Sequence, residues 1–543
     1  MRNFQNVLSF ISHGTLFNRL LASKKLDPAE VERLRRIKSF WEFYEGYHWN
    51  EINTDAEAGE ASEVTINYCR AFVNKFVAFE LGAAFTINLT KHIANLKVTA
   101  EGRTMQQFLE DVWVDNQRGT LCTELGQSKS VTGDAWLKVT FLPSGSDGLD
   151  DSFGEYPQGK ISISVVPTLY VNAKYNQHNK DRLEEVTVQY IIEVERGFIT
   201  LKPKEVLYQE VWTREEVVYY EDGNETDRIV NLYGVIPFVQ IKNFPIQGKT
   251  YGASDIEDII PMNVEFNLKK SNVSEIIDYH AAPITVVFGA KIGNLEKGAN
   301  KVWGGMPKEG RVENLHMQGD VTAATVYTKT LKTEMCEVAG IPESVLGGVQ
   351  AVSNTSGVAM QYMNLPLIER TQVKRALTRN GLEKINKLIL HIALHEGLIT
   401  KPESTTVAEV FEDGGIQGRR EVTIPVTSSE FYYSEVVLPD TLPKDKLMEM
   451  QQIQMELSLG LESRPGALQR LGREDIPSKL AEIDEDRRLH PDFYGLTPVD
   501  DNEATTNDGN ADERGENRQR EINPGMLNGE YAHQLVEQTP GSL

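Results

Sequence analysis

The sequence predicts an α+β fold with more than one core, and three observations support this prediction. The chain has 543 residues, 40% of them hydrophobic and 25% charged, a balance typical of a folded protein too long for one simple core. Apolar residues recur at helical spacing in several segments. Residues 135–230, by contrast, are rich in β-branched and aromatic runs separated by turn residues. We expect two to four structural regions.

The N-terminal region, residues 1–250, begins with helices. Residues 27–50 start with a helix N-terminal signal and end in an aromatic cluster that we expect to pack rather than to bind bases. Residues 65–81 carry an apolar stripe that ends at Gly82, which predicts a core-facing helix. Another helix is predicted near residues 105–125.

The same region then changes to strands. Runs of strand-forming residues occupy positions 135–141, 161–167 and 186–194. Asp222 and Gly223 follow a further run and have the composition of a tight hairpin turn. These segments predict an antiparallel β region.

Two helices are predicted in the middle of the chain, within regions 251–281 and 320–341. The first should cover residues 256–280, about 37 Å at 1.5 Å per residue, with Pro261 near its start. The second should cover residues 322–339, where a glycine and a proline follow. A strand-like run and a glycine-punctuated stretch separate them. The two helices therefore flank a short β-containing insertion, residues 282–319.

Residues 342–356 indicate a hinge. Gly347 and Gly348 allow the backbone to bend, and the four polar residues after Val352 offer side-chain oxygens to the free amides of a helix start. Read alone, the segment is more typical of an ordinary connection between helices. The longest predicted helix follows in region 357–397, with a kink at Pro366.

The C-terminal part divides into a compact region and a tail. Region 398–495 contains two strand-like runs and then helical patterns at residues 444–460, 464–471 and 477–488. Region 496–543 is an acidic tail. Between Asp500 and Glu521 there are eight acidic residues, three basic residues and no aromatic one, so we expect this stretch to be disordered.

The formal net charge of -23 bears on function. A protein that grips DNA phosphates for affinity is expected to be basic, and this chain is not. An acidic protein can still surround DNA without holding it, because like charges keep the polyanion off its walls. Net negative charge can also serve solubility alone. No run of 18 apolar residues indicates a membrane span, and the N-terminus does not read as a secretory signal, so a cytoplasmic protein is expected.

Motifs for enzymes and metal sites are incomplete. Residues 293–298 resemble half of a phosphate-binding loop, but Ala299 and Asn300 replace the required Lys and Ser or Thr. Gly248 to Thr250 provide the other half without the first glycine. His391 and His395 share a helix face but lack the intervening Glu of a zinc protease, and we expect a pair of satisfied helix histidines. The three cysteines, expected to be buried thiols, match no zinc or disulfide spacing. We expect no enzyme activity, no metal and no cofactor.

Several separated segments resemble, in the right order, the portal proteins of tailed bacteriophages, with an SPP1-like pattern. The resemblance covers about residues 67–488, and it is closest in three stretches: VAGIPESVLGG, SGVAMQYMNLPLIERTQVKR and the run from LPDTLPKDKL to SKLAEI. The chain departs from the pattern after Gly82, where many relatives place a proline and this chain has Ala83, Ala84 and Phe85. The local turn at that point stays open.

The resemblance implies a fold of named parts assembled as a ring, usually of twelve subunits. Regions 251–281 and 320–341 would be the stem helices, and the small α/β insertion 282–319 the clip. Region 342–356 would be the tunnel loop, region 357–397 the long kinked wing helix, and region 398–495 the last wing strands and a helical crown. The N-terminal region 1–250 would supply the β-rich wing.

The resemblance also implies a function and its residues. The ring would form a channel at one capsid vertex, through which double-stranded DNA is packaged and ejected. Val349, Ala351 and Val352 would line its narrowest part, where Gln350, Ser353 and Asn354 touch DNA weakly. Lys269 or Lys270 would face the channel, although a lysine in a surface salt bridge is an equal interpretation. Clip residues that would dock partners are Trp303, Met306 and Lys308.

The implied partners are the terminase large subunit, a head-completion or adaptor protein, and the major capsid and scaffolding proteins. The implied location is the portal vertex of the virion, after assembly in the host cytoplasm. Two alternatives remain open. One is an ATPase or nuclease of the packaging apparatus, which the broken phosphate loops oppose, and the other is a capsid-associated structural protein without a channel.

Overall fold

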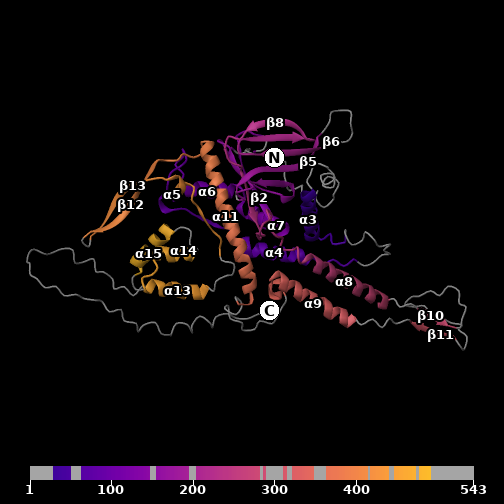
Figure 1. The fold of residues 1–543 in the computed structure, drawn as a ribbon. Coiled ribbons are helices and arrows are strands. Elements are labelled where there is room, and N and C mark those ends of the chain that lie inside the picture. The colour runs from indigo at the N-terminus through magenta and orange to yellow at the C-terminus, as the bar shows by residue number, and fades with distance from the viewer. Residues whose placement is uncertain are drawn as a thin grey trace, which may run out of the picture. The chain divides into compact units, whose positions relative to one another are not determined.

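Figure 1 shows the fold in a computed structural model of the chain. The residues that the structure describes are 28–49, 63–146, 149, 154–180, 182–194, 204–281, 285–288, 310–314, 321–347, 362–413, 416–439, 446–471 and 476–490. The chain forms two compact units, Met1–Pro443 and Lys444–Leu543. The boundary divides the region predicted at 398–495, so that its strands belong to the first unit and its last three helices to the second. In the described part of the chain no helix has the length and apolar character to cross a membrane.

Antiparallel sheets form the body of the first unit (Figure 1). A three-stranded sheet has the order β3-β2-β9, and a five-stranded sheet follows the chain as β4-β5-β6-β7-β8. The bounds are β2 Asp134–Leu142, β3 Lys160–Val166, β4 Val171–Tyr175, β5 Leu183–Val194, β6 Lys204–Trp212, β7 Glu216–Glu221, β8 Asn224–Val230 and β9 Phe238–Lys242. The short helix η1 (Thr168–Tyr170) joins the two sheets. The predicted α+β class and its antiparallel region are confirmed.

The hairpin between β7 and β8 turns where the sequence predicts it. Asp222 and Gly223 both have positive φ, 49° and 81°, as a type I′ turn requires. Asp222 also accepts a hydrogen bond from the Leu207 amide at 3.0 Å, which ties the turn to β6.

The N-terminal helices are α3 (Pro28–Glu45), α4 (Tyr68–Leu81), α5 (Lys91–Ala94), α6 (Met105–Asp115) and α7 (Arg118–Thr132). The helices expected at 27–50 and 65–81 are confirmed, and α4 ends before Gly82 as predicted. The single helix expected near 105–125 is wrong. Gln117, with φ 51°, separates α6 from α7, because the Asn116 side chain bonds the β3 backbone at Ile161 and Ile163.

Two hydrophobic clusters form the core of this unit. One joins α3 and α4 to the five-stranded sheet and the bases of the middle helices, and the other joins α6, α7, β2 and the second half of the longest helix. In the second cluster the buried Trp113 donates its indole N–H to Asn386 at 2.8 Å. Its ring meets Phe85 edge-on, with centroids 5.0 Å apart. The two clusters bury the apolar stripes that the sequence predicts for the helices.

The two middle helices run side by side (Figure 1) and are called the stem pair below. They are α8 (Ile260–Ala281) and α9 (Val321–Ala339). Between them lies a two-stranded antiparallel sheet of β10 (Thr285–Phe288) and β11 (Arg311–Asn314). The α8 helix starts at Ile260, four residues later than predicted, because Pro261 takes a first-turn position where its missing N–H costs no helical bond.

The longest described helix is α11 (Leu365–His395). Tyr362 and Met363 are helical and Asn364 is a turn, so the helical run is interrupted just before Pro366, where the sequence predicts a kink. Pro366 occupies the first turn of α11, and the predicted start at Gly357 lies outside the described residues. Gly381 lets α11 approach β9, because a Cβ atom there would stand 2.4 Å from the Ile241 side chain. The longest element is thereby placed directly on the three-stranded sheet.

The remaining strands pair within the first unit, and three helices lie in the described part of the second. The bounds are β1 Thr86–Asn88, β12 Ser404–Asp413, β13 Ile416–Pro425, α12 Ser428–Phe431, β14 Glu435–Val437, α13 Lys446–Ser458, α14 Arg464–Arg470 and α15 Ile476–Leu489. β1 pairs with β14, and β12 pairs with β13. The three helices match the predicted C-terminal helices closely.

Candidate functional site

A buried ionic cluster lies where α4, α7, α11 and the loop before α8 meet. Its members are Glu80, Lys129, Asp255 and Lys374, all nearly or fully buried. Lys374 binds Asp255 at 2.6 Å and lies 3.7 Å from Glu80, which also pairs with Lys129. Thr378 bridges Glu80 and Lys129, at 2.7 and 2.6 Å. Two anions and two cations therefore balance inside the fold.

Burial and pairing act in opposite directions on these groups. Burial alone would raise the pKa of Asp255, but the charges of Lys374 and Arg370, with a hydrogen bond from Ser130, hold that pKa below its ordinary value. Burial lowers the pKa of Lys129, and the neighbouring carboxylate of Glu80 opposes this shift. Each buried charge is stabilised by its partner, so removal of one member leaves another as an unpaired buried charge.

Asp255 links this cluster to the stem pair. It lies five residues before α8, and its backbone amide donates to the Ser130 carbonyl at 2.9 Å. Arg370 of α11 binds Asp255 at 3.2 Å and donates to the Val338 carbonyl near the end of α9 at 3.3 Å. The start of α11 is therefore tied to the end of α9 and to the loop that leads into α8.

A second polar cluster fixes α8 to the segment that leads into α4. Asn263, Asn267 and Ser271, one turn apart on α8, bond the backbone of residues 64–69. Asn263 accepts from the amide of Tyr68 at 2.9 Å and donates to the Ile66 carbonyl at 2.8 Å. We call this set of three side chains the amide ladder. It caps the first turn of α4 from outside, because that turn has no helical acceptors for its amides.

His48 completes the amide ladder. Its Nε2 lies 2.9 Å from the Phe43 carbonyl and its Nδ1 lies 2.7 Å from the Asn267 side-chain nitrogen. The Asn267 oxygen accepts from Ile66, so its nitrogen is the donor to Nδ1, and the ring is neutral with its proton on Nε2. Burial lowers the pKa of His48. This ring holds α3 and α8 together only in its neutral form.

The residues expected to face the channel have different surroundings. Lys269 pairs with Glu265 on its own helix at 3.2 Å, and Lys270 lies over the Phe266 ring at 5.6 Å. Gly347, with φ 90°, ends the short helix η2 (Glu343–Leu346). The other predicted site residues lie outside the described residues, and their roles stay predictions: Val349, Gln350, Ala351, Val352, Ser353, Asn354, Trp303, Met306 and Lys308.

The histidine pair has the structural role expected from the sequence. His391 hydrogen bonds through Nε2 to the Tyr233 carbonyl at 2.8 Å, and His395 meets the Tyr233 ring edge-on at 5.3 Å. Among the side chains that the structure describes, no group of three His, Cys, Asp or Glu is arranged to hold a metal ion.

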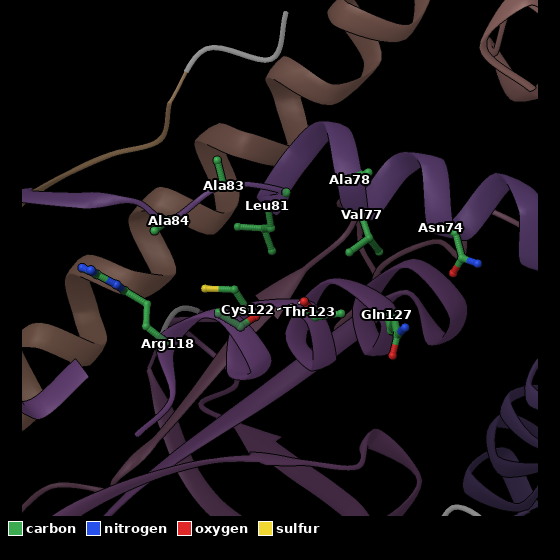
Figure 2. A pocket seen from close by; sticks show the side chains of 12 residues that line it. Asn74, Val77, Ala78, Leu81, Ala83, Ala84, Arg118, Cys122, Thr123 and Gln127 are labelled. Atoms are coloured by element: carbon green, nitrogen blue, oxygen red, sulfur yellow. Dashed lines mark hydrogen bonds between the residues drawn. The ribbon is translucent and has the colours of Figure 1, made fainter. Parts of the chain in front are cut away.

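The cysteines are buried, as predicted. Cys122 lines a pocket of about 360 Å³ between α4 and α7, opposite Val77 and Leu81 (Figure 2). Burial raises the pKa of the Cys69 and Cys122 thiols to about 12, so neither is a thiolate nucleophile at neutral pH. Arg118 at the rim is engaged with the Phe85 carbonyl and Glu110.

Sequence reasoning missed both polar clusters. Glu80 lies among the buried Phe76, Val77 and Leu81, and this place in an apolar stripe is a signal of a buried charge with a partner. The amide ladder has helical spacing, but polar residues one turn apart ordinarily indicate a solvent face. Neither partner set could be identified without the fold.

The described elements define an α+β protein, in which a sheet body carries a pair of long helices and the polar clusters join them. Residues 23–488 match the family model for the phage portal protein, SPP1 Gp6-like, and the chain belongs to this family. It is thus a portal protein of a bacteriophage, with a place in the capsid and in DNA packaging. A search of curated proteins found no match.

Proposed function

We propose that twelve copies of this chain form a ring at one capsid vertex, and that double-stranded DNA is packaged and ejected through its central channel. The observation that supports this most is the stem pair, whose base is tied to the body by the ionic cluster and the amide ladder. A helix pair anchored in this way can stand in a ring wall, because neither helix depends on its neighbour copies for its attachment.

The proposed constriction is the loop between α9 and α11, with Val349, Ala351 and Val352 as its apolar residues. Before the loop, Glu343 of η2 accepts from Thr333 of α9 at 2.7 Å and pairs with Lys332 at 3.5 Å. After it, Arg370 and Lys374 fix α11 to Asp255. Both ends are thus held, which suits a loop that changes shape locally while its supporting helices stay in place.

Passage requires weak contact with DNA. The formal charge of -23 per copy disfavours adhesion of the polyanion to the wall, and Gln350, Ser353 and Asn354 offer only neutral contacts. Of the two stem lysines, Lys269 is paired with Glu265, so Lys270 is the better candidate to face the channel.

The clip, residues 282–319, is the proposed docking site for the terminase large subunit and later for head-completion or adaptor proteins, through Trp303, Met306 and Lys308. The motor would supply the energy, and the portal itself would be no enzyme. Scaffolding and major capsid proteins are the proposed partners during assembly in the host cytoplasm, before the ring takes its place in the virion.

Negative-stain images of the purified full-length protein test the proposal. We expect rings with a central hole wide enough for a duplex and a twelvefold class average. Solid particles or monomers under all conditions would contradict the channel. The same preparation, assayed for ATP hydrolysis without an added motor subunit, separates the portal from the ATPase or nuclease alternative, for which sustained turnover is required.

A further inference from the structure

A lysine-rich hollow lies on the first unit. Its volume is about 620 Å³, and it is lined by β9, the end of β4 and the turn after it, the loop near residue 250, and the middle of α11. Four lysines from four separate segments surround it: Lys180, Lys242, Lys249 and Lys384. No Asp or Glu is among the residues that line it.

None of these four lysines makes an ion pair or a side-chain hydrogen bond with any residue that the structure describes. The nearby carboxylates are engaged elsewhere. Asp134, which faces Lys242, is buried and accepts from Gln240 and the Gly252 amide, and Glu184 accepts from Asn176 at 2.5 Å. In a chain with 79 acidic and 56 basic residues, a hollow with four lysines and no lining carboxylate is a departure from the average surface.

The positive surface continues into a neighbouring hollow. This second hollow, of about 430 Å³, shares Leu183 and Phe238 with the first and adds Arg182 and Arg214. Because the two hollows share two lining residues, we treat them as one surface with six basic side chains. We call it the basic groove.

The ligand must be anionic and narrow. Hollows of this size take small ligands or single side chains, whereas a DNA duplex is bound by cations spread over an extended face. Gln240 and Asn380 add amide groups beside the lysines, and β9 is an edge strand of its sheet. We propose that the basic groove binds an acidic peptide segment of a partner protein, with its carboxylates on the lysines.

Such a site would determine which partner binds during assembly and in which register. The net charge of the chain repels acidic partners elsewhere on its surface, so a local basic groove selects both the partner and its register. This inference stands apart from the proposed channel, since it concerns a surface of the folded chain and not the ring.

The test is binding of a fluorescein-labelled decaglutamate peptide to the full-length protein, measured by anisotropy at low salt. The variant Lys249→Glu/Lys384→Glu changes two exposed groove lysines. The control Lys91→Glu/Lys97→Glu changes two exposed lysines outside it and alters the net charge equally. We expect about a tenfold loss of affinity in the groove variant and less than a twofold loss in the control.

Three outcomes would overturn the proposal: no binding of the peptide, an equal loss in both variants, or tighter binding of a duplex oligonucleotide with the same dependence on Lys249 and Lys384. The milder Lys249→Gln/Lys384→Gln variant, compared with wild type by circular dichroism, guards against misfolding, and it must also weaken peptide binding.

Discussion

Helices α11 and α8 are anchored by different kinds of interaction. The base of α11 is held by buried charges, with Lys374 between Glu80 and Asp255, whereas α8 is held by neutral amides of Asn263 and Asn267. A buried ion pair must recover a large desolvation cost through its partner, and an amide only replaces hydrogen bonds to water. We therefore expect that removal of one charge weakens the whole α11 anchor, whereas removal of one amide weakens the α8 anchor only in part.

The largest effect is expected at Asp255. Replacing it with Ala leaves Lys374 and Arg370 without their shared anion in a buried site, which should destabilise the fold by about 3–5 kcal/mol. Urea unfolding followed by tryptophan fluorescence measures this loss. The control Glu101→Ala removes an exposed salt bridge to Arg103 and should cost less than about 1 kcal/mol.

A double variant sharpens that result. Asp255→Leu with Lys374→Met removes one anion and one cation and leaves the Glu80 and Lys129 pair balanced. It should recover part of the stability lost in Asp255→Ala. If it is less stable than the single variant, the charges matter less than the shape of the site.

A smaller effect is expected in the amide ladder. Asn263→Ala leaves the Tyr68 amide and the Ile66 carbonyl without their partner, at a cost of roughly 1–3 kcal/mol. Asn95→Ala, which removes an exposed bond to the Lys91 carbonyl, is the matched control and should stay within about 0.5 kcal/mol. A loss as large as that at Asp255 would remove the distinction between the two anchors.

His48 makes the stability contributed by the amide ladder depend on pH. Burial lowers its pKa in the folded state below the ordinary 6.5, so the stability it contributes is complete above pH 6.5 and is lost as the pH falls through the folded pKa. His48→Gln removes this titration. The midpoint of urea unfolding should therefore fall less between pH 7.5 and pH 5 in the variant than in wild type.

Asp134 gives stability the opposite pH dependence, but its effect is the same in wild type and in the His48→Gln variant. Burial raises its pKa to about 6, so its contribution to stability declines as the pH rises through that value, in wild type and variant alike. Equal falls in the two proteins would show that His48 stays neutral or is not titrated within the window.

The smallest effect is expected at Lys269. Its partner Glu265 is one helical turn away, and both side chains are more than a third exposed, so Lys269→Ala should change stability by less than about 0.5 kcal/mol. The midpoint of thermal unfolding, compared between the variant and wild type, would detect a larger change in stability. A loss above 1 kcal/mol would mean that this lysine has a partner beyond its own helix.

The sequence predicted those parts of the fold that local chemistry decides. The Asp222 and Gly223 hairpin, the stop of α4 before Gly82 and the stem pair all depend on neighbouring residues. The break at Gln117 was missed, because Asn116 leaves its helix to bond β3, and such a partner is not visible in a linear pattern.

The candidate site was predictable only in part. The segments that resemble portal proteins identified the family, and the family match agrees with them. The ionic cluster was not predicted, because its four charges come from four separate segments and the sequence does not show which charges become partners. Likewise, the basic groove arises from lysines that are distant in the chain and meet only when α11 packs on β9.

The close approach at Gly381 has a consequence for the evolution of the chain. Since the Ile241 side chain already fills the space of a Cβ atom there, alanine at 381 requires a smaller residue at 241 to accommodate it. The two positions form a compensating pair, and variation at either is restricted by the other. Ile241 and Gly381 also line the basic groove. The width of that groove therefore depends on this pair of residues and not on any single lysine.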